Sequence, residues 1–194
     1  MTLKQSIVKF IYPVWMFIQK LTGSKDKLFF NKEKKQPPVS FYSLKSILNN
    51  GEEFLFAELK GKKVLIVNTA SDCFYTNQYD ELEKLYRLYS SNLNVLAFPA
   101  NDFKEQEKAD DNSIVQFCKL NFGVSFPLMK KSIVVKSDHQ NEVYQWLTHT
   151  DKNGWNTKQP GWNFSKYLVD ENGILTHYFE PTVSPLAKEI IKLL

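Results

Sequence analysis

An alternation of apolar strand-like runs with helical repeats limits the fold of this chain more than any other feature. Val64 to Val67 is a short run whose β-branched residues are typical of a buried strand. Apolar residues then recur at helical spacing from Leu82 to Tyr89, and we place the i,i+4 pair Glu83 and Arg87 on the outer face of this helix. A second apolar run, Leu93 to Phe98, follows. This order predicts a layered α/β domain.

A second helix follows the second apolar run. Ile114, Phe117 and Cys118 share one face of this helix. We expect it to begin near Asp110 or Asp111, because aspartate is a good N-cap residue.

The C-terminal third adds strands to the same sheet. Ile133 to Val135 and Tyr167 to Val169 are predicted strands, and Asn172-Gly173 is a strong hairpin signal that leads into a strand from Ile174 to Phe179. Residues 186–194 are predicted to form a closing helix. The fold class predicted is therefore α/β, with a central mixed sheet flanked by helices.

Composition excludes several classes of protein. The chain has 194 residues, of which 43% are hydrophobic, so it can bury a substantial core. Two cysteines, Cys73 and Cys118, are too few for a disulfide-stapled scaffold and form no C-x-x-C pair. The three histidines show no metal-ligand spacing with them or with one another. We therefore expect neither a metal nor another cofactor.

The positive charge lies in the N-terminal segment. Residues 1–38 carry eight lysines, Asp26 and Glu33, which gives a net charge of +6, whereas the remaining 17 basic and 19 acidic residues give −2. Arg87 is the only arginine, although nucleic-acid interfaces depend on arginine for base and phosphate contacts. The sequence therefore predicts no nucleic-acid partner.

The segment Ile7 to Leu21 is aromatic and contains Lys9 and Pro13. It is shorter than the roughly 20 apolar residues of a membrane-spanning helix, and no small-residue cleavage site follows it. Two interpretations stay open: a helix packed on the domain, or an interfacial segment that brings Trp15 and neighbouring lysines to an anionic membrane. We expect residues 1–38 to be a leader and linker, residues 39–194 to be the domain, and the protein to be cytoplasmic with or without this membrane contact.

Cys73 is the first candidate for chemistry. It falls between a predicted strand and a predicted helix, where N–H groups and the partial positive charge of the helix N-terminus stabilise an anion. A thiol at such a position has a lowered pKa, and its thiolate is the nucleophile. The alternative is a buried cysteine that acts only as a small hydrophobic residue.

Four separated segments resemble the glutathione peroxidase family. Residues 68–79 (NTASDCFYTNQY) are similar to its signature around the peroxidatic residue, and residues 98–107 (FPANDFKEQE) are similar to its second block. Trp162-Asn163-Phe164 matches the third block, and residues 116–127 (QFCKLNFGVSFP) resemble the region of the resolving cysteine. The segments occur in family order from about residue 39 onwards.

The resemblance implies a thioredoxin-like fold and a catalytic set of Cys73, Gln106, Trp162 and Asn163. The amide and indole N–H groups would stabilise the sulfur anion and the charge that develops as the peroxide O–O bond breaks. The implied activity is reduction of hydrogen peroxide and of organic or lipid hydroperoxides through a Cys73 sulfenic acid. Two alternatives are a solvated loop residue for Gln106 and a plain core residue for Trp162.

A second Gly-Trp-Asn triplet, residues 154–156, precedes the one at residues 161–163. We assign the second copy to the site because Phe164 and the following strand fit the family pattern. The first copy is interpreted as a loop feature.

The resemblance also implies that Cys118 resolves the sulfenic acid, whereas the helical pattern alone favours an inert core thiol. A disulfide needs Cα atoms about 4.4–6.8 Å apart, so oxidation should loosen the helix over residues 111–121. Thioredoxin is the expected reductant, since an intramolecular disulfide is its natural substrate and the chain nearly lacks the arginines that hold glutathione carboxylates. Because residues 136–161 lack the long insertion of tetrameric relatives, we expect a monomer.

Three positions depart from the family pattern. Phe74 and Ala100 stand where the family usually has glycine and a further cysteine, and Lys104-Glu105 replaces a glycine pair before Gln106. Three other functions are alternatives to a peroxidase. A disulfide oxidoreductase would need a C-x-x-C pair. A non-enzymatic redox sensor would use the same cysteines without turnover, and a membrane-attached binding module with an inactive domain depends only on the leader.

Overall fold

Five strands form the central sheet of the structure, a computed structural model that describes residues 6–7, 10–12, 14–15 and 28–194. Their order across the sheet is β1-β7-β6-β4-β5. β4 and β5 pair in parallel, and every other neighbouring pair is antiparallel, so the sheet is mixed. The strand bounds are β1 (Leu28–Phe30), β4 (Lys63–Thr69), β5 (Leu93–Pro99), β6 (Lys166–Val169) and β7 (Leu175–Phe179).

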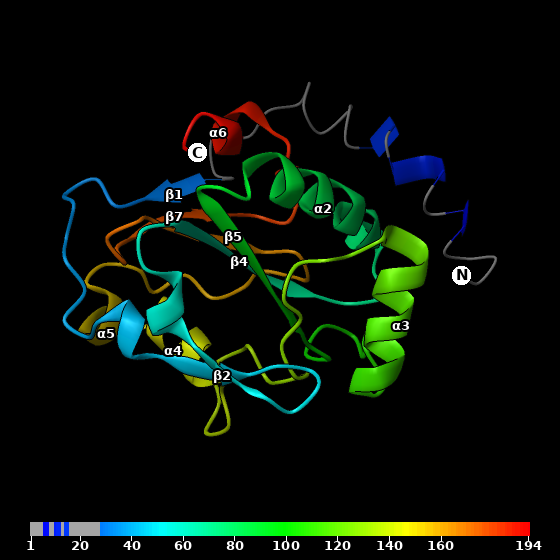
Figure 1. Cartoon of the computed structure of the whole chain (residues 1–194), viewed down its shortest axis with the longest axis horizontal. Coiled ribbons are helices and arrows are strands. Elements are labelled where there is room, and N and C mark those ends of the chain that lie inside the picture. The colour runs from blue at the N-terminus through cyan, green and yellow to red at the C-terminus, as the bar shows by residue number, and fades with distance from the viewer. Residues whose placement is uncertain (1–5, 8–9, 13, 16–27) are drawn as a thin grey trace.

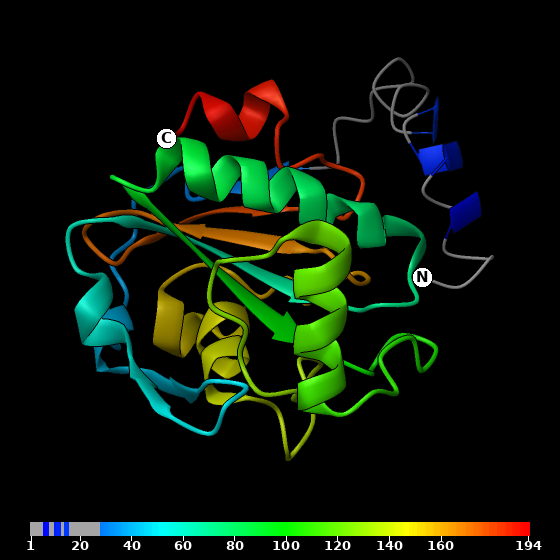
Figure 2. The same cartoon turned by 45° about the vertical axis from the view of Figure 1, so that its right-hand side comes forward.

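Helices cover both faces of this sheet (Figures 1 and 2). The helices on one face are α2 (Gln78–Tyr89), α3 (Asp111–Phe122) and α6 (Lys188–Ile191). The opposite face carries α4 (Glu142–Thr148), α5 (Thr150–Asn153) and the hairpin of β2 (Lys45–Ile47) and β3 (Glu53–Leu55). The short 3-10 turns are η2 (Phe41–Ser43), η3 (Phe56–Leu59) and η4 (Phe74–Asn77).

Strand alternation divides the core into two clusters. Leu65 and Val67 of β4 pack with α2 and α3, whereas Val64 and Ile66 pack with α4, because successive side chains point to opposite faces. All four are completely buried, and each contributes about 1.5–3 kcal/mol of hydrophobic stabilisation. The central strand β4 therefore fixes the position of its C-terminal end, where Cys73 follows.

Most of the predicted elements are confirmed. β4, α2, β5, β6 and β7 lie where the patterns placed them. α3 begins at Asp111, and the side chain of Asp110 caps it by accepting the N–H of Ser113 at 2.8 Å. Gly173 adopts φ +80° in the hairpin turn, which explains the Asn-Gly signal.

Other elements were predicted wrongly. Residues 133–135 form no strand, because the N–H of Val134 bonds to the carboxylate of Asp102 and its carbonyl accepts the amide of Gln140. Glu83 pairs with Arg87, but its carboxylate is buried and also accepts the N–H and hydroxyl of Ser125, so it does not lie on an outer face.

The closing helix is shorter than predicted. α6 spans only Lys188–Ile191, since the N–H groups of Leu193 and Leu194 bond three residues back and form turns. α4 and α5 lie within residues 136–161, for which no helix was predicted.

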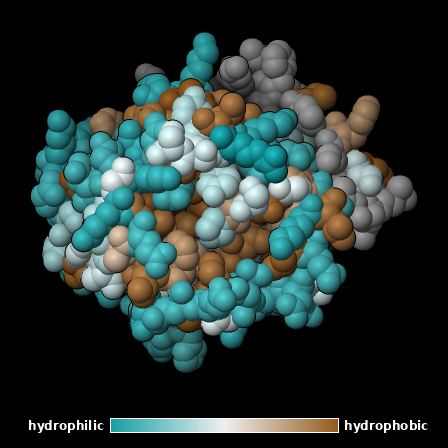
Figure 3. All heavy atoms as spheres, viewed as in Figure 1, coloured by the Kyte–Doolittle hydropathy of each residue, from teal (hydrophilic) through white to brown (hydrophobic). Residues whose placement is uncertain are grey.

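The N-terminal segment contacts the domain at two places. β1 lies within the predicted leader and pairs with β7 in the sheet. The described residues between 6 and 15 are helical, and Tyr12 is buried while Phe10 is 87% exposed. Apolar side chains stand out beside the grey atoms at the upper right of Figure 3. Of the predicted segment Ile7 to Leu21, residues 8–9, 13 and 16–21 lie outside the described residues. Among the residues described, none of the helices has the length and apolarity needed to cross a bilayer.

Candidate active site

Cys73 lies in the loop between β4 and η4, which runs directly into α2. Its N–H donates to the hydroxyl oxygen of Thr76 at 3.0 Å, and its sulfur accepts the N–H of Tyr75 at 3.4 Å. The Thr76 hydroxyl in turn donates to the carbonyl oxygens of Ala70 and Cys73. The sulfur is therefore held at the start of the helical segment, as the sequence predicted.

A buried carboxylate fixes the loop before Cys73. Glu107 is fully buried and accepts both the N–H of Ser71, at 2.8 Å, and its hydroxyl, at 2.7 Å. The N–H of Asp72 donates to the carbonyl of Gln106 at 3.1 Å. The segments that carry Cys73 and Gln106 are therefore bonded together side by side.

The four residues implied by the resemblance come together. The amide of Asn163 donates to the side-chain oxygen of Gln106 at 3.0 Å. The side chains of Trp162 and Asn163 lie close enough to the Cys73 sulfur to act as hydrogen-bonding groups that lower the pKa of its thiol. The Trp162 ring packs on Phe103 with a centroid distance of 5.4 Å, and Trp162 is half-buried rather than a closed core residue.

A tight turn positions Trp162 and Asn163. Phe164, the next residue, has φ +68°, an unfavourable conformation for an aromatic residue. Its N–H donates to the carbonyl of Asn68 at 2.6 Å, and the Asn68 amide donates to the carbonyl of Trp162 at 3.1 Å. The end of β4 therefore holds both the loop of Cys73 and the turn of its partners.

The electrostatics of Cys73 differ from the sequence prediction. Burial raises the pKa of its thiol above the ordinary value, and the nearby Asp72 adds to this effect. The hydrogen bonds from Tyr75, Trp162 and Asn163 act in the opposite direction but do not outweigh burial. The predicted lowered pKa is therefore wrong, because the Cys73 residue is buried, with only 4% of its surface exposed.

The first Gly-Trp-Asn triplet lies elsewhere. The indole N–H of Trp155 donates to the carbonyl of Leu175 at 2.7 Å, and the amide of Asn156 donates to that of Leu147. These contacts tie a loop to β7 and α4, as the loop interpretation predicted.

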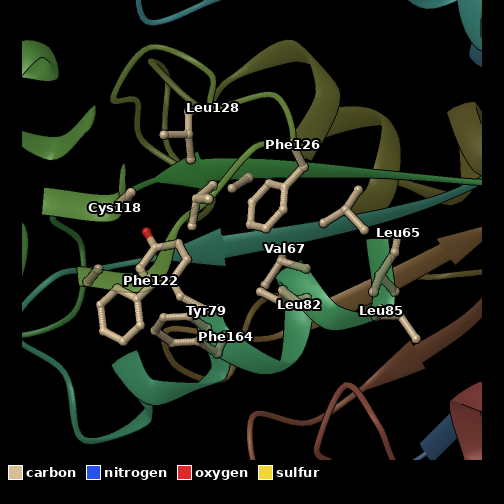
Figure 4. Packing of buried hydrophobic residues seen from close by; sticks show 14 of the residues in the cluster. Leu65, Val67, Tyr79, Leu82, Leu85, Cys118, Phe122, Phe126, Leu128 and Phe164 are labelled. Carbon is tan, nitrogen blue, oxygen red and sulfur yellow. The ribbon is translucent and has the colours of Figure 1, made fainter. Parts of the chain in front are cut away.

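Cys118 is fully buried on α3, in the same core cluster as Cys73, and both thiols are free. Burial raises its pKa to about 12, and the hydroxyl of Tyr79 lies beside it. Figure 4 shows Tyr79 pointing toward α3 among Phe122 and Phe164. In this conformation Cys118 is a protected core thiol.

The departures from the family pattern have structural consequences. Lys104 and Glu105 both adopt positive φ values, +51° and +52°, so the loop keeps a conformation that glycine adopts readily. Phe74 packs against Tyr12 and Trp15 of the leader, with centroid distances of 6.1 and 5.7 Å. An aromatic surface that includes the leader therefore lies next to Cys73. Ala100 is fully buried in the core cluster on the α4 face of the sheet.

The sequence analysis did not identify Asn68, Ser71, Thr76 and Glu107 as parts of the site. Asn68, Ser71 and Thr76 lie inside the quoted segment 68–79, so their proximity to Cys73 was a usable signal. Glu107 lies in the charged stretch around Gln106, and only the structure reveals that it is buried and in contact with Ser71.

The fold and the site together define a thiol protein with a thioredoxin-like α/β fold. A DsbF homologue from Corynebacterium diphtheriae superimposes with a TM-score of 0.62 at 15% identity, over 88% of this chain and 95% of that chain, which supports this fold. The crystal structure of Trgpx in apo form gives a TM-score of 0.61 at 31% identity, over 79% of this chain and 94% of that one.

Sequence comparisons identify the family within this class of thioredoxin-like thiol proteins. A family model described as glutathione peroxidase matches residues 41–148. Glutathione peroxidase-like peroxiredoxin 2 of Saccharomyces cerevisiae is 45% identical over 159 residues, which cover 80% of this chain and 98% of the relative. The chain belongs to the glutathione peroxidase family, and it is an enzyme that acts on peroxides.

Proposed function

We propose that the Cys73 thiol reduces hydrogen peroxide and organic or lipid hydroperoxides. The sulfur attacks one peroxide oxygen, so that an S–O bond forms and the O–O bond breaks. The thiol proton passes to the leaving oxygen, which departs as water or an alcohol, and Cys73 becomes a sulfenic acid. The thiol and the peroxide balance this step without a further base.

The observation that carries this proposal is the set of N–H donors around one sulfur. The N–H of Tyr75 donates to the Cys73 sulfur at 3.4 Å, and the side chains of Trp162 and Asn163 lie beside it and act to lower the pKa of its thiol. Such donors stabilise negative charge on sulfur and on the departing oxygen more than they stabilise the neutral thiol. Because burial keeps the pKa of Cys73 raised, we expect this stabilisation to act mainly as the peroxide reacts.

We further propose that Cys118 resolves the sulfenic acid and that thioredoxin re-reduces the enzyme. The Cys118 sulfur displaces the sulfenic oxygen as water and forms a disulfide, which a thioredoxin dithiol then reduces by exchange. Both cysteines border one core cluster, which supports this pairing. Since Cys118 is fully buried on α3, we expect the helix to open before the disulfide forms.

A coupled assay tests the cycle. Peroxide consumption is followed through NADPH oxidation with thioredoxin and thioredoxin reductase, or with glutathione and glutathione reductase, for hydrogen peroxide, an organic hydroperoxide and a phospholipid hydroperoxide. We expect turnover with thioredoxin, loss of turnover in Cys73→Ser, and a single turnover in Cys118→Ser. Full activity of Cys73→Ser would refute the role of Cys73, and sustained turnover of Cys118→Ser would refute the two-cysteine cycle. Sedimentation under assay conditions checks the monomer that we propose.

We also propose that the leader contacts an anionic membrane surface. Phe10, Ile11 and Val14 are between 49% and 87% exposed, although they are large apolar residues. The net charge of +6 in residues 1–38 favours anionic headgroups. Vesicles rich in phosphatidylserine should therefore bind the protein, and Phe10→Asp should weaken this binding. Leu88→Asp is the control, because Leu88 is 73% exposed on α2. Equal binding of both variants would contradict the proposal.

A further inference from the structure

Lys166 is a lysine with no solvent exposure in the centre of the domain, at the start of β6. Its ammonium donates to the carbonyl oxygen of Phe164 at 2.8 Å. Two carboxylates face it, Glu81 from α2 and Glu180 after β7. Each has another close partner: Glu81 accepts the hydroxyl of Ser184, and Glu180 pairs with Lys158 at 2.9 Å. The Phe164 carbonyl is therefore the direct hydrogen-bond partner of this buried amine.

Burying an ammonium group is unfavourable, and an apolar residue of similar length would fit a buried strand better. The position of Lys166 therefore needs an explanation other than packing. Its acceptor is the carbonyl of the residue in the left-handed conformation, directly after Asn163.

Hydrogen bonds fix both the N–H and the carbonyl of Phe164. The N–H of Phe164 donates to the Asn68 carbonyl at 2.6 Å, and its carbonyl accepts Lys166 at 2.8 Å. A left-handed aromatic residue persists only when its surroundings hold it there. Without Lys166, the carbonyl would lose its buried donor and the turn could relax toward an ordinary conformation.

We infer that Lys166 is a positioning residue of the peroxidase site, which fixes the Phe164 carbonyl and thereby aims the side chains of Trp162 and Asn163 at the Cys73 sulfur. This inference rests on the proposed function of Cys73. Lys166 touches neither the sulfur nor the peroxide in this account, and acts only through the turn.

The charge state of Lys166 should also affect the pH dependence of the peroxidase rate. Burial lowers its pKa to about 7, an effect that Glu81 and Glu180 partly offset. A charged donor holds a carbonyl more strongly than a neutral amine does. We therefore expect the rate to contain an ionisation near neutral pH that belongs to Lys166, in addition to that of the Cys73 thiol.

The test compares Lys166→Met, Lys166→Gln and the control Lys158→Met, which removes the neighbouring exposed partner of Glu180. Circular dichroism and melting establish that each variant is folded. The readouts are kcat/KM for hydrogen peroxide between pH 6 and 9 and the pKa of Cys73 from its alkylation rate. We expect Lys166→Met to lower kcat/KM about 10- to 100-fold, a range typical of a misplaced catalytic group, and to raise the pKa of Cys73. Lys158→Met should change neither.

Lys166→Gln keeps a donor but loses the charge. It should retain more activity than Lys166→Met and should lack the ionisation near neutral pH. If Lys166→Met does not fold, persistence of that ionisation in Lys166→Gln overturns the inference. A folded Lys166→Met variant with wild-type kcat/KM and an unchanged pKa of Cys73 also overturns it. A wild-type protein without peroxidase activity would instead refute the proposed function.

Discussion

At the scale of single residues, two opposing effects act on the sulfur of Cys73. Burial favours the neutral thiol, whereas the donors of Tyr75, Trp162 and Asn163 favour the anion. The Cys73 thiol is thus buried and kept protonated, beside groups that would stabilise a negative charge on its sulfur. The reactivity of this site then depends on how accurately its loops are held.

Glu107 is the residue whose removal should loosen the Cys73 loop. Glu107→Ala removes the buried carboxylate that accepts both the N–H and the hydroxyl of Ser71, so we expect a loss of about 1–3 kcal/mol in the free energy of unfolding and a lower peroxidase rate. Glu105→Ala is the matched control, because Glu105 is exposed and forms a surface ion pair with Lys108. Urea denaturation and the coupled assay measure both effects. Equal stability of the two variants would contradict this role for Glu107.

The sequence predicted the members of the site better than their environment. The family resemblance identified Cys73, Gln106, Trp162 and Asn163, and the structure brings them together. The sequence could not reveal that the pKa of Cys73 is raised, because the burial that raises it depends on contacts between distant segments. The role of Lys166 was not predicted either. Lys166 precedes the predicted strand Tyr167 to Val169, and a lysine at such a position is ordinarily solvated.

At the scale of secondary-structure elements, α3 is the part that must change during the proposed cycle. Cys118 is fully buried on this helix, and its pKa is raised to about 12 by burial. Attack of Cys118 on the Cys73 sulfenic acid therefore requires a local opening of α3 that exposes the Cys118 thiol.

Hydrogen exchange should detect this opening. Peroxide-treated protein should exchange amide protons of α3 faster than the reduced protein, with little change in β4. Cys118→Ser is the control, because its α3 should exchange equally before and after treatment. Unchanged protection of α3 in a protein shown to contain the Cys73–Cys118 disulfide would refute the requirement for opening.

The edge of the sheet should be sensitive to acid. His177 on β7 stacks between Phe30 of β1 and Phe179, and burial lowers its pKa to about 4 from 6.5. Between these values the unfolded chain binds a proton that the folded chain does not, so stability is lost as the pH falls from 6.5 toward 4. We expect this loss to be on the order of 1–2 kcal/mol for the partly exposed ring.

Replacing His177 tests this acid sensitivity. His177→Phe should flatten the pH dependence of the melting temperature below pH 6.5, whereas His139→Gln, at an exposed position, should not. An unchanged acid profile of His177→Phe would assign the sensitivity to other groups.

Helices and strands with a strong apolar periodicity were predicted from the sequence, and those without such a periodicity were not. β4 and α2 follow simple apolar patterns, and both are present. Residues 133–135 have strand-forming side chains, but Asp102 and Gln140 satisfy their backbone groups instead of a neighbouring strand. No local pattern reveals such long-range bonds.

At the scale of the whole molecule, the leader and the domain meet beside the site. β1 adds a strand to the sheet, so residues before the predicted linker take part in the fold. Tyr12 and Trp15 contact Phe74, which immediately follows Cys73. The sequence identified an aromatic segment but left open whether it packs on the domain or lies on a membrane, because that choice depends on the tertiary arrangement.

Phe74 should anchor the leader. Phe74→Ala removes both ring contacts, so limited proteolysis should cleave within residues 1–27 several-fold faster. Tyr42→Ala is the control, since the Tyr42 ring packs on Phe41 and its hydroxyl donates to the carbonyl of Glu171. Identical cleavage rates for the wild type and Phe74→Ala would show that these contacts do not hold the leader.

The central claim is that the Cys73 sulfur takes an oxygen atom from the peroxide within the turn formed by Trp162 and Asn163. The most direct test treats reduced Cys118→Ser protein with an equimolar amount of hydrogen peroxide and locates the oxidation by mass spectrometry with a sulfenic-acid trap. We expect one trapped adduct, on Cys73, that forms much more slowly when Trp162→Phe and Asn163→Ala are introduced. An unmodified Cys73, or an adduct that forms equally fast without these two donors, would contradict it.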